Sequence, residues 1–402
     1  MKLPFHKNVA VLSFALIVVM LGFGMVIPIF PFYIERLGAG GSAFGLLVAI
    51  AALTELIFGP FWGSLSDRTG RKPILMIGML GFGLSMVLFG ISTQLWQLFL
   101  FRGLSGVLSS ATLSPAMAYI GDSTPERDRG GSMGALGAAA GLGLILGPAL
   151  GGLLAGSSLA TPFFVGAGLA VVAAVLIGLF LPESLPRPAR KADGRIGFLN
   201  VRELGEALRS PIGVLLLLAF LATVGTSNFE AIFSLYAVDA LSYGPEQVGL
   251  ILSVVGVVAL VGRGVLTGVF TRRWGEPVVI QGALLAAAVT FVLLLLAQSF
   301  AAVLLTVALF VLIAAFLRPA IHSLTSQRAT VGQGAAMGLS GAFVSLGRIV
   351  GPLWAGAVYD LRTWLPYASG AVILVCVFLL SRRWLGGKAA GLADSPADPV
   401  TS

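Results

Sequence analysis

Twelve long apolar stretches, separated by short polar segments, follow one another along the chain. Their residues do not alternate between apolar and polar, and each stretch is close to the roughly 20 residues that a helix needs to cross a bilayer. The pattern predicts an all-α membrane protein with 12 transmembrane helices. We expect these spans near residues 9–31, 44–62, 73–92, 95–119, 132–155, 161–181, 212–237, 247–267, 277–297, 300–322, 334–357 and 364–381.

The composition points to the same surroundings. Of the 402 residues, 57% are hydrophobic and 10% are charged, and the mean hydropathy is +0.99. A water-soluble domain carries roughly a quarter charged residues. A soluble monomer could not bury this many apolar side chains, so lipid must cover much of the surface.

The two halves of the chain are similar to each other at one constant offset. A shift of 204 residues places Gly45 on Gly249 and Pro148 on Pro352. Further matching pairs are Glu35 and Asp239, Arg68 and Arg272, Pro73 and Pro277, Pro115 and Pro319, and Met133 and Met337. Because each repeat holds an even number of spans, both halves would have the same orientation, as in transporters with parallel repeats. Two such six-helix bundles could rock about a central site.

This repeat predicts an N-terminal six-helix bundle (residues 1–181), a cytoplasmic linker (182–211), a C-terminal six-helix bundle (212–385) and a disordered tail (386–402). The tail has few apolar residues. The linker has apolar residues at helical spacing, which are Phe198, Val201, Leu204 and Leu208. It would form either a short amphipathic helix on the inner membrane surface or a solvated connector.

Basic residues, which give the net charge of +8, are unevenly distributed. If the first span enters from the cytoplasm, most Lys and Arg residues fall in cytoplasmic segments, and only Arg36 and Arg362 lie outside. This positive-inside pattern puts both termini in the cytoplasm. The charge therefore reflects topology, and we expect a multi-pass protein of the inner (cytoplasmic) membrane with no nucleic-acid partner.

An ordered run of small and charged residues follows the second span. It reads Gly63-Ser-Leu-Ser-Asp67-Arg68-Thr-Gly70-Arg71-Lys72. Glycine permits the tight turn that a short connecting loop needs, and Asp67 can pair with a nearby cation or cap a helix N-terminus. A plain basic loop would not need this order. We expect the segment to act as a gate; its copy in the second half has lost the Asp.

The fifth span carries small residues at spacings of three to four, which are Gly143, Gly147, Pro148, Gly151 and Gly152. Such residues let helices pack backbone to backbone, and a proline inside a span can kink it. Generic close packing is the alternative explanation, since membrane helices are rich in glycine.

Both segments resemble signatures of the major facilitator superfamily. The first is similar to its loop pattern G-x-L-x-D-R-x-G-R-K, and the second to the G-P-x-x-G-G run of its antiporters. The similarity to the twelve-helix drug:proton antiporters, in the quinolone and multidrug exporter branch, covers most of the chain, including residues 22–28 and 228–236. It implies the major facilitator fold and export of lipophilic, often cationic, drugs in exchange for protons by alternating access.

The sequence also departs from that branch. The tenth span reads Ala-Ala-Phe-Leu over residues 314–317, where the branch tends to have an Asp, and the first span has no acid of the kind found in tetracycline exporters. The substrate and the number of coupled protons therefore stay open.

Arg102 in the fourth span resembles the arginine motif of the family. An arginine within the bilayer costs at least about 2.5–3.5 kcal/mol, so it should face the bundle interior. The alternative is an arginine that reaches to the outer interface. Ser105, Ser109 and Thr112 follow at helical spacing and would line the same face.

Two carboxylates, Glu55 and Glu230, lie well inside the predicted spans, and such residues are functional candidates by default. Glu230 belongs to a polar stripe with Thr223, Ser227 and Ser234. The resemblance implies that this glutamate accepts protons and cationic drugs. The alternative is a structural ion pair with Arg102 or Arg348. The further candidates for proton or substrate contact are Arg318, Tyr236 and Phe23.

Other activities of the same fold are an uptake symporter and a lipid or glycolipid flippase, and only the signature in the fifth span argues against a symporter. With two histidines and one cysteine, the chain offers no catalytic constellation and no metal site. We expect no enzymatic activity and no cofactor, with the proton gradient as energy source. The expected partners are a small lipophilic substrate, protons and membrane lipids, and the expected state is a monomer.

Overall fold

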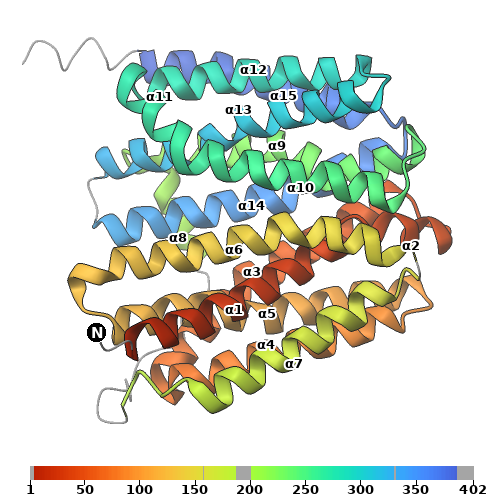
Figure 1. Ribbon diagram of the computed structural model, residues 1–402. Helices are drawn as coiled ribbons and strands as arrows, with labels where there is room; N and C mark the ends of the chain where they lie inside the picture. The colour runs from red at the N-terminus through yellow and green to blue at the C-terminus, as the bar shows by residue number, and fades with distance from the viewer. Residues whose placement is uncertain (1–3, 157, 187–200, 330–331, 387–402) are drawn as a thin grey trace, which may run out of the picture. The chain divides into compact units, whose positions relative to one another are not determined.

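The computed structural model describes residues 4–156, 158–186, 201–329 and 332–386, and the regular structure in these ranges is helical (Figure 1). The first half of the chain forms α1 (Pro4–Val26), α2 (Phe30–Arg36), α3 (Gly41–Thr69), α4 (Arg71–Gly90), α5 (Leu95–Ser123), α6 (Glu126–Ala155) and α7 (Thr161–Phe180). The second half forms α8 (Val201–Leu208), α9 (Gly213–Asp239), α10 (Pro245–Val261), the π-helix η2 (Gly262–Leu266), α11 (Thr267–Trp274), α12 (Glu276–Leu296), α13 (Phe300–Gln327), α14 (Gln333–Tyr359) and α15 (Leu365–Gly386).

Eleven helices in the described ranges are long and apolar enough to cross a membrane, one of them running from α10 through η2 to α11. The remaining long helix is α5, which has 29 residues. It carries Arg102 and several serines, so it is less apolar than the others. With α5 the helices agree with the twelve predicted spans, and the all-α fold is confirmed.

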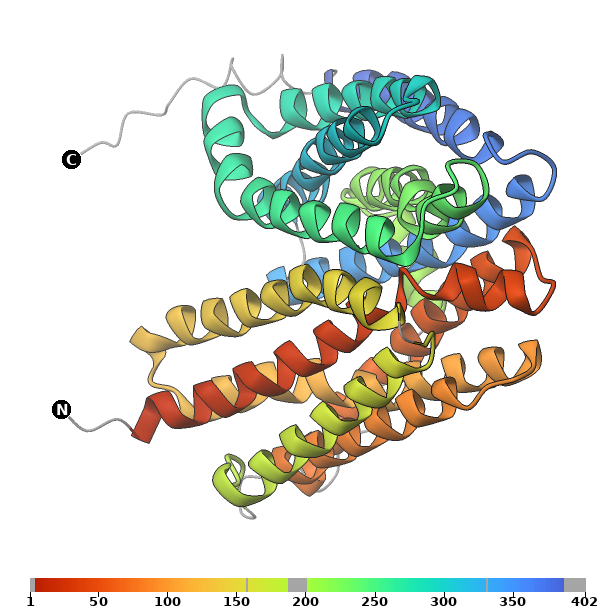
Figure 2. The same cartoon turned by 45° about the vertical axis from the view of Figure 1, so that its right-hand side comes forward.

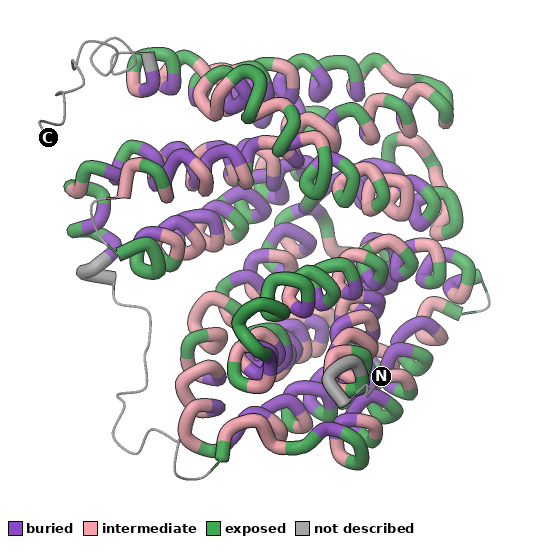
Figure 3. Tube along the Cα trace, turned by 60° about the vertical axis from the view of Figure 1, so that its left-hand side comes forward, coloured by how far each residue is buried: buried purple, intermediate pink, exposed green. Residues whose placement is uncertain are grey.

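Exposed residues follow one another along these helices (Figure 3), and many of them are large and apolar, as expected for surfaces that lipid covers. Leu179 is 72% exposed, Leu296 71% and Leu305 70%. A water-soluble protein rarely exposes contiguous apolar patches of this kind.

The first predicted span is interrupted. Helix α1 ends at Val26, and α2 begins at Phe30 after a turn that contains Pro28. Proline has no N–H group to donate and its ring clashes with the preceding turn, so a break is expected there. The interruption gives the chain a short separate helix, α2, beyond the end of the first span.

Of the linker, residues 182–186 and 201–211 are described, and α8 forms the helix that the apolar spacing suggested. Leu204 is buried, and Leu208 is exposed. Phe198 and the predicted disordered tail beyond residue 386 lie outside the described residues.

The chain divides into two compact units that do not follow its two sequence halves. Unit 1 contains Met1–Val201, Asn228–Leu260 and Arg348–Pro366, and unit 2 contains Arg202–Ser227, Val261–Gly347 and Tyr367–Ser402. Helices α9 and α14 therefore each begin in unit 2 and end in unit 1. The predicted bundles at 1–181 and 212–385 describe the sequence repeat, and they stay a prediction.

In unit 1, α1 packs against α6 and α7, and α3 packs against α5 (Figure 1). Helix α4 lies between α5 and α7, and Figure 2 shows α4 and α7 running side by side. The rings of Phe30, Phe89 and Phe163 meet at centroid distances of 5.5–6.4 Å and join α2, α4 and α7.

In unit 2, α12 packs along α13, and the stacked rings of Phe291 and Phe310 lie 4.6 Å apart at this contact. Tyr367 of α15 meets the edge of the same cluster, 5.9 Å from Phe291. The π-helix η2 also packs on α13. These contacts give unit 2 its own aromatic core.

Candidate functional site

The buried side chain of Arg71 joins one end of α3, α4 and α5. Its guanidinium lies 2.6 Å from Asp67 Oδ1 and 2.9 Å from Asp122 Oδ2, and it donates a hydrogen bond of 2.6 Å to Ser66 Oγ. Arg71 is 7% exposed. Without both acids the buried charge would be uncompensated, so these contacts strongly favour the observed arrangement of the three helices.

Of the two contacts that the sequence suggested for Asp67, the structure shows the pairing with a cation, Arg71. The N-terminus of α4 is capped by another residue. Glu183 accepts hydrogen bonds from the backbone N–H groups of Arg71 (2.8 Å) and Lys72 (3.2 Å). A carboxylate is favoured there by the helix dipole. Because Glu183 follows α7, this cap joins α7 to the same end of unit 1.

The signature segment is helical, and the expectation of a loop is wrong. Gly63, Asp67 and Arg68 lie on the last turns of α3, and α4 begins at Arg71. Only Gly70 lies between the two helices, with φ of 106°, a conformation that favours glycine. A helix can continue past the apolar stretch because its backbone groups bond within the helix whatever its side chains are.

The glycines of the fifth span bring α6 against two other helices. A methyl group at Gly147 would lie 2.6 Å from the carbonyl oxygen of Leu21 on α1, and one at Gly152 would lie 2.5 Å from that of Pro245 on α10. Gly143 and Gly151 make similarly close approaches to α1. Side chains at these positions would push the helices apart, so the run of small residues packs α6 between α1 and α10.

Two helix crossings in unit 1 are related by the sequence repeat. Gly249 of α10 packs on the carbonyl of Pro148 and on Gly152 in α6, and Gly45 of α3 packs in the same way on Pro352 and Gly356 in α14. The shift of 204 residues converts one set of contacts into the other. Each crossing joins a helix of the first half to a helix of the second half.

The α3–α14 crossing carries a polar latch. Asp360, just after α14, accepts hydrogen bonds from the backbone N–H groups of Gly41 (2.6 Å) and Ser42 (2.9 Å) at the start of α3. Next to it, the hydroxyl of Tyr359 donates a hydrogen bond of 2.8 Å to Asp239 at the end of α9. These bonds join the ends of α3, α9 and α14 within unit 1.

Arg102 faces the interior of the bundle, in line with the first of its two interpretations. It is 8% exposed, and its Nε donates a long hydrogen bond of 3.4 Å to the carbonyl of Leu47 on α3. Its guanidinium carbon lies 5.2 Å from the ring centroid of Phe30 and 5.9 Å from that of Phe23. Aromatic faces attract such a cation. Ser105, Ser109 and Thr112 are buried on the same helix.

The structure brings Glu55 together with Arg348. Glu55 Oε2 lies 3.6 Å from Arg348 Nη1, and both side chains are about half exposed, at 54% and 45%. An exposed pair in water is worth at most about 1 kcal/mol. Arg348 is one of the two arginines that the sequence suggested as an ion-pair partner of Glu230. In the structure it pairs with Glu55 instead.

Glu230 is exposed on α9, and within the described residues it forms no ion pair. Its neighbours along the polar stripe, Ser227 and Ser234, are buried, as is Tyr236. No ion pair joins Glu230 to Arg102 or to the pair on α3 and α14 in the described part of the chain. Among the described residues, Glu230 is therefore an exposed carboxylate without an ion-pair partner.

The candidate residue of unit 2 is Arg318 on α13, which is exposed. One turn later, His322 Nδ1 lies 3.2 Å from the hydroxyl of Ser340 on α14. Within the described residues, no group of three or more His, Cys, Asp and Glu side chains is placed to hold a metal ion.

Sequence reasoning missed several residues that join helices, which are Asp122, Glu183, Asp239, Tyr359 and Asp360. Each lies at the end of a span or directly after it. Acids at such positions are common, and no spacing pattern tells a cap on a distant helix from a solvated charge. The one usable signal was the repeat, because Asp360 falls on Gly156 and so stands out as an acid without a counterpart.

In its described residues, the structure has twelve long helices, an internal repeat with two matching crossings, and charged residues within its spans. These features define a polytopic membrane transporter. The sequence profile of the Major Facilitator Superfamily matches residues 12–329 and, in a second match, residues 215–399. The chain belongs to this superfamily, and it is a transporter rather than an enzyme.

Two curated relatives match nearly the whole chain. It is 31% identical over 370 residues to Multidrug resistance protein 2 of Bacillus subtilis (strain 168), which covers 91% of this chain and 92% of the relative. It is 30% identical over 378 residues to the Quinolone resistance protein NorA of Staphylococcus aureus (strain MSSA476), which covers 93% and 96%.

A solved structure confirms the fold. The chain superposes on a crystal structure of the nucleoside transporter NupG with a TM-score of 0.77 and 15% sequence identity, over 93% of this chain and 99% of that one. At this identity the likeness is one of fold alone.

Proposed function

We propose that this chain is a proton-coupled exporter of lipophilic, often cationic, small molecules in a bacterial cytoplasmic membrane. The observation that carries the proposal is the similarity of 30–31% to two drug-resistance proteins over more than 90% of this chain and of each relative. The gate residues Asp67 and Arg71 and the glycines of α6 support it, since they form defined contacts in unit 1.

The orientation follows from the basic residues. With both termini in the cytoplasm, the end of unit 1 that carries Arg71 lies inside, and the end that carries Asp360 lies outside. In this orientation the two glycine crossings and the Asp360 latch close the outer end. The cluster at Arg71 holds the inner ends of α3, α4 and α5.

Glu230 is the residue to which we assign the coupled proton. An ionised carboxylate without an arginine partner attracts a lipophilic cation, and a proton that binds the same oxygen removes that attraction. Exchange of the two ligands at one group would couple export to proton entry. Ser227, Tyr236 and Phe23 are the polar and aromatic groups that we assign to substrate contact.

The charged residues Glu55 and Arg348 connect α3 to α14, which also form the latched crossing. Arg102 lies on α5 beside α3, and its single long hydrogen bond leaves most of its donors available. A change in the charge at Glu55 would therefore act on the same helices that close the outer end. Arg318 of unit 2 is kept as a candidate for contact with the substrate or a coupled proton.

The proton gradient is the proposed energy source, with no cofactor, and the proposed functional state is a monomer. The test is transport of the fluorescent cation ethidium in proteoliposomes under an imposed pH gradient. We expect export driven by protons that move the opposite way. Co-movement of cation and protons would indicate a symporter, and transport of a fluorescent phospholipid in place of ethidium would indicate a flippase.

Glu230→Gln removes the ionisable group and keeps the shape of the side chain. We expect at least a tenfold loss of pH-driven ethidium export. Glu246→Gln at the start of α10 is the matched control, because it removes an exposed acid of the same half and should leave export unchanged. Full pH-driven export by Glu230→Gln would show that another group carries the coupled proton.

A further inference from the structure

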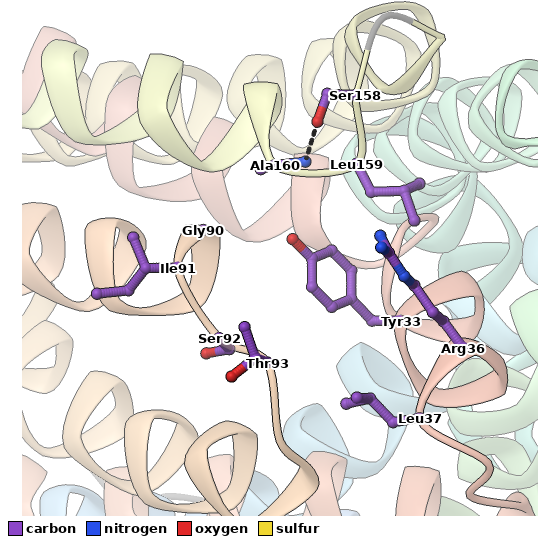
Figure 4. Close-up of a pocket in the computed structure, with 10 residues that line it drawn as sticks. All are labelled: Tyr33, Arg36, Leu37, Gly90, Ile91, Ser92, Thr93, Ser158, Leu159 and Ala160. Atoms are coloured by element: carbon purple, nitrogen blue, oxygen red, sulfur yellow. Dashed lines mark hydrogen bonds between the residues drawn. The ribbon is translucent and has the colours of Figure 1, made fainter.

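A polar cavity of about 380 Å³ lies at one end of unit 1 (Figure 4). Three segments that are far apart in the sequence form its walls: the end of α2, the connection from α4 to α5, and the residues that lead into α7. The lining residues are Tyr33, Arg36, Leu37, Gly90, Ile91, Ser92, Thr93, Ser158, Leu159 and Ala160.

The cavity lies where three spans leave the membrane. The apolar span of α1 ends at Val26, α4 ends at Gly90, and α7 begins at Thr161. The lining residues come from α2 and the residue after it, from the end of α4 and the residues after it, and from the residues directly before α7. A cavity at this level faces the headgroups of the lipids.

Two hydroxyls of the cavity, those of Tyr33 and Ser158, can donate hydrogen bonds into it, whereas those of Ser92 and Thr93 donate to Leu88 and Gln97. Tyr33 is 7% exposed, and its hydroxyl points into the cavity without a hydrogen bond in the described part of the chain. Burial raises the pKa of this hydroxyl, against the opposing effect of the Arg36 charge, so it stays a donor at neutral pH. Ser158 Oγ accepts a hydrogen bond from the N–H of Ala160 (3.3 Å), which leaves its own proton to donate.

Arg36 supplies the charge of the cavity. Its guanidinium extends along the opening toward Leu159 (Figure 4), and it has no ion pair within the described ranges. No carboxylate is among the lining residues. A site with a cation and two available hydroxyl donors favours an anionic acceptor such as a phosphate.

An apolar stripe leads from the cavity down the outer face of α4. Leu80, Leu84, Val87 and Ile91 recur at spacings of three to four, and they are 50%, 52%, 37% and 56% exposed. Phe164 of α7, which is 45% exposed, lies beside the stripe at Gly90. A ligand that fits both parts has an anionic head and a long apolar tail.

We propose that this cavity binds the phosphate group of an anionic phospholipid whose acyl chain lies along the α4 stripe. Arg36 pairs with the phosphodiester, and the hydroxyls of Tyr33 and Ser158 donate hydrogen bonds to the lipid headgroup. In the orientation proposed above, this is a lipid of the outer leaflet. The bound lipid joins α2, α4 and α7 at the rim of unit 1, and its binding does not depend on which substrate the transporter carries.

The test is native mass spectrometry of the purified, delipidated full chain titrated with dioleoyl-phosphatidylglycerol. Phosphatidylcholine and glycerol 3-phosphate are the comparison probes. We expect tighter binding of phosphatidylglycerol than of either, because only it has both a net negative head and acyl chains. Loss of a charge-assisted hydrogen bond predicts about a tenfold weaker affinity for Arg36→Gln, and loss of a neutral one about threefold for Tyr33→Phe.

Arg362→Gln is the matched control, since Arg362 is the other arginine expected on the same side and is not part of the cavity. If Arg36→Gln and Arg362→Gln lose the same affinity for phosphatidylglycerol, the effect comes from general surface charge, and the proposed lipid site is wrong. Leu84→Gln tests the stripe. It should weaken the binding of phosphatidylglycerol and leave the binding of glycerol 3-phosphate unchanged. If glycerol 3-phosphate binds as tightly as the lipid, the site takes soluble phosphates, and the lipid proposal is wrong.

Discussion

The Asp360 latch gives the most direct test of how the outer end is held closed. Two backbone N–H groups, those of Gly41 and Ser42, donate to its carboxylate at 2.6 and 2.9 Å. First-turn amides have no acceptor within their own helix, so Asp360 is the residue that satisfies them. Asp360→Ala removes both acceptors at once.

The size of the effect follows from this geometry. Replacing an N-cap acceptor by alanine costs about 0.5–2 kcal/mol. Because Asp360 is exposed, water competes for both amides, so we expect about 1 kcal/mol, or about a fivefold change in the population of the latched form. Asp360→Asn keeps one acceptor oxygen and should lose less than Asp360→Ala.

Hydrogen–deuterium exchange measures this change at the amides themselves. For Asp360→Ala we expect about fivefold faster exchange in the first turn of α3 and faster exchange around Gly356, where α14 crosses α3. Glu246→Gln is the control. Glu246 occupies the position of the second half that corresponds to Ser42 in the repeat. Among the described residues it accepts no hydrogen bond from another helix, so its replacement should not change the exchange of the α3 amides. Unchanged exchange at Gly41 and Ser42 in Asp360→Ala would refute the latch.

Other contacts make further predictions. Gly147→Val places a side chain against the backbone of α1, so we expect a loss of about 1–3 kcal/mol in stability, measured as a lower Tm in detergent. Asp122→Ala leaves Asp67 as the one carboxylate of Arg71 and should cost about 2 kcal/mol, the size of one lost charge-assisted hydrogen bond; an unchanged Tm would show that Asp67 alone satisfies the arginine. Glu55→Gln removes the half-exposed pair with Arg348, so its Tm should fall by less than that of Asp122→Ala, whereas pH-driven export should fall clearly.

Much of the helical framework could be predicted from the sequence because the bilayer imposes a length and a composition on every span. The predicted span 161–181 and α7 (Thr161–Phe180) differ by one residue at the end. Helix ends outside the apolar stretches were harder to predict. Helix α3 continues to Thr69, well beyond the predicted end at residue 62, because a polar helix end satisfies its own backbone and leaves no mark in hydropathy.

The candidate site was only partly predictable, for a different reason. The interior position of Arg102 follows from the cost of a charge in lipid, which the residue type alone reveals. The pairing of Glu55 with Arg348 joins residues from different halves of the chain, and composition cannot choose between Glu55 and Glu230 as the partner. Asp360 meets α3 across more than 300 residues, so only the folded chain shows the latch.

The two glycine crossings are the same contact made twice, because the shift of 204 residues converts one into the other. Such a repeat is what joining two copies of one six-helix chain in the same orientation would produce. In a dimer of such chains the contact would form twice across a twofold axis. Asp360 falls on Gly156 in the repeat, so the carboxylate that holds the first turn of α3 has no equivalent at that position of the other crossing. The two crossings thus share their packing and differ at this polar contact.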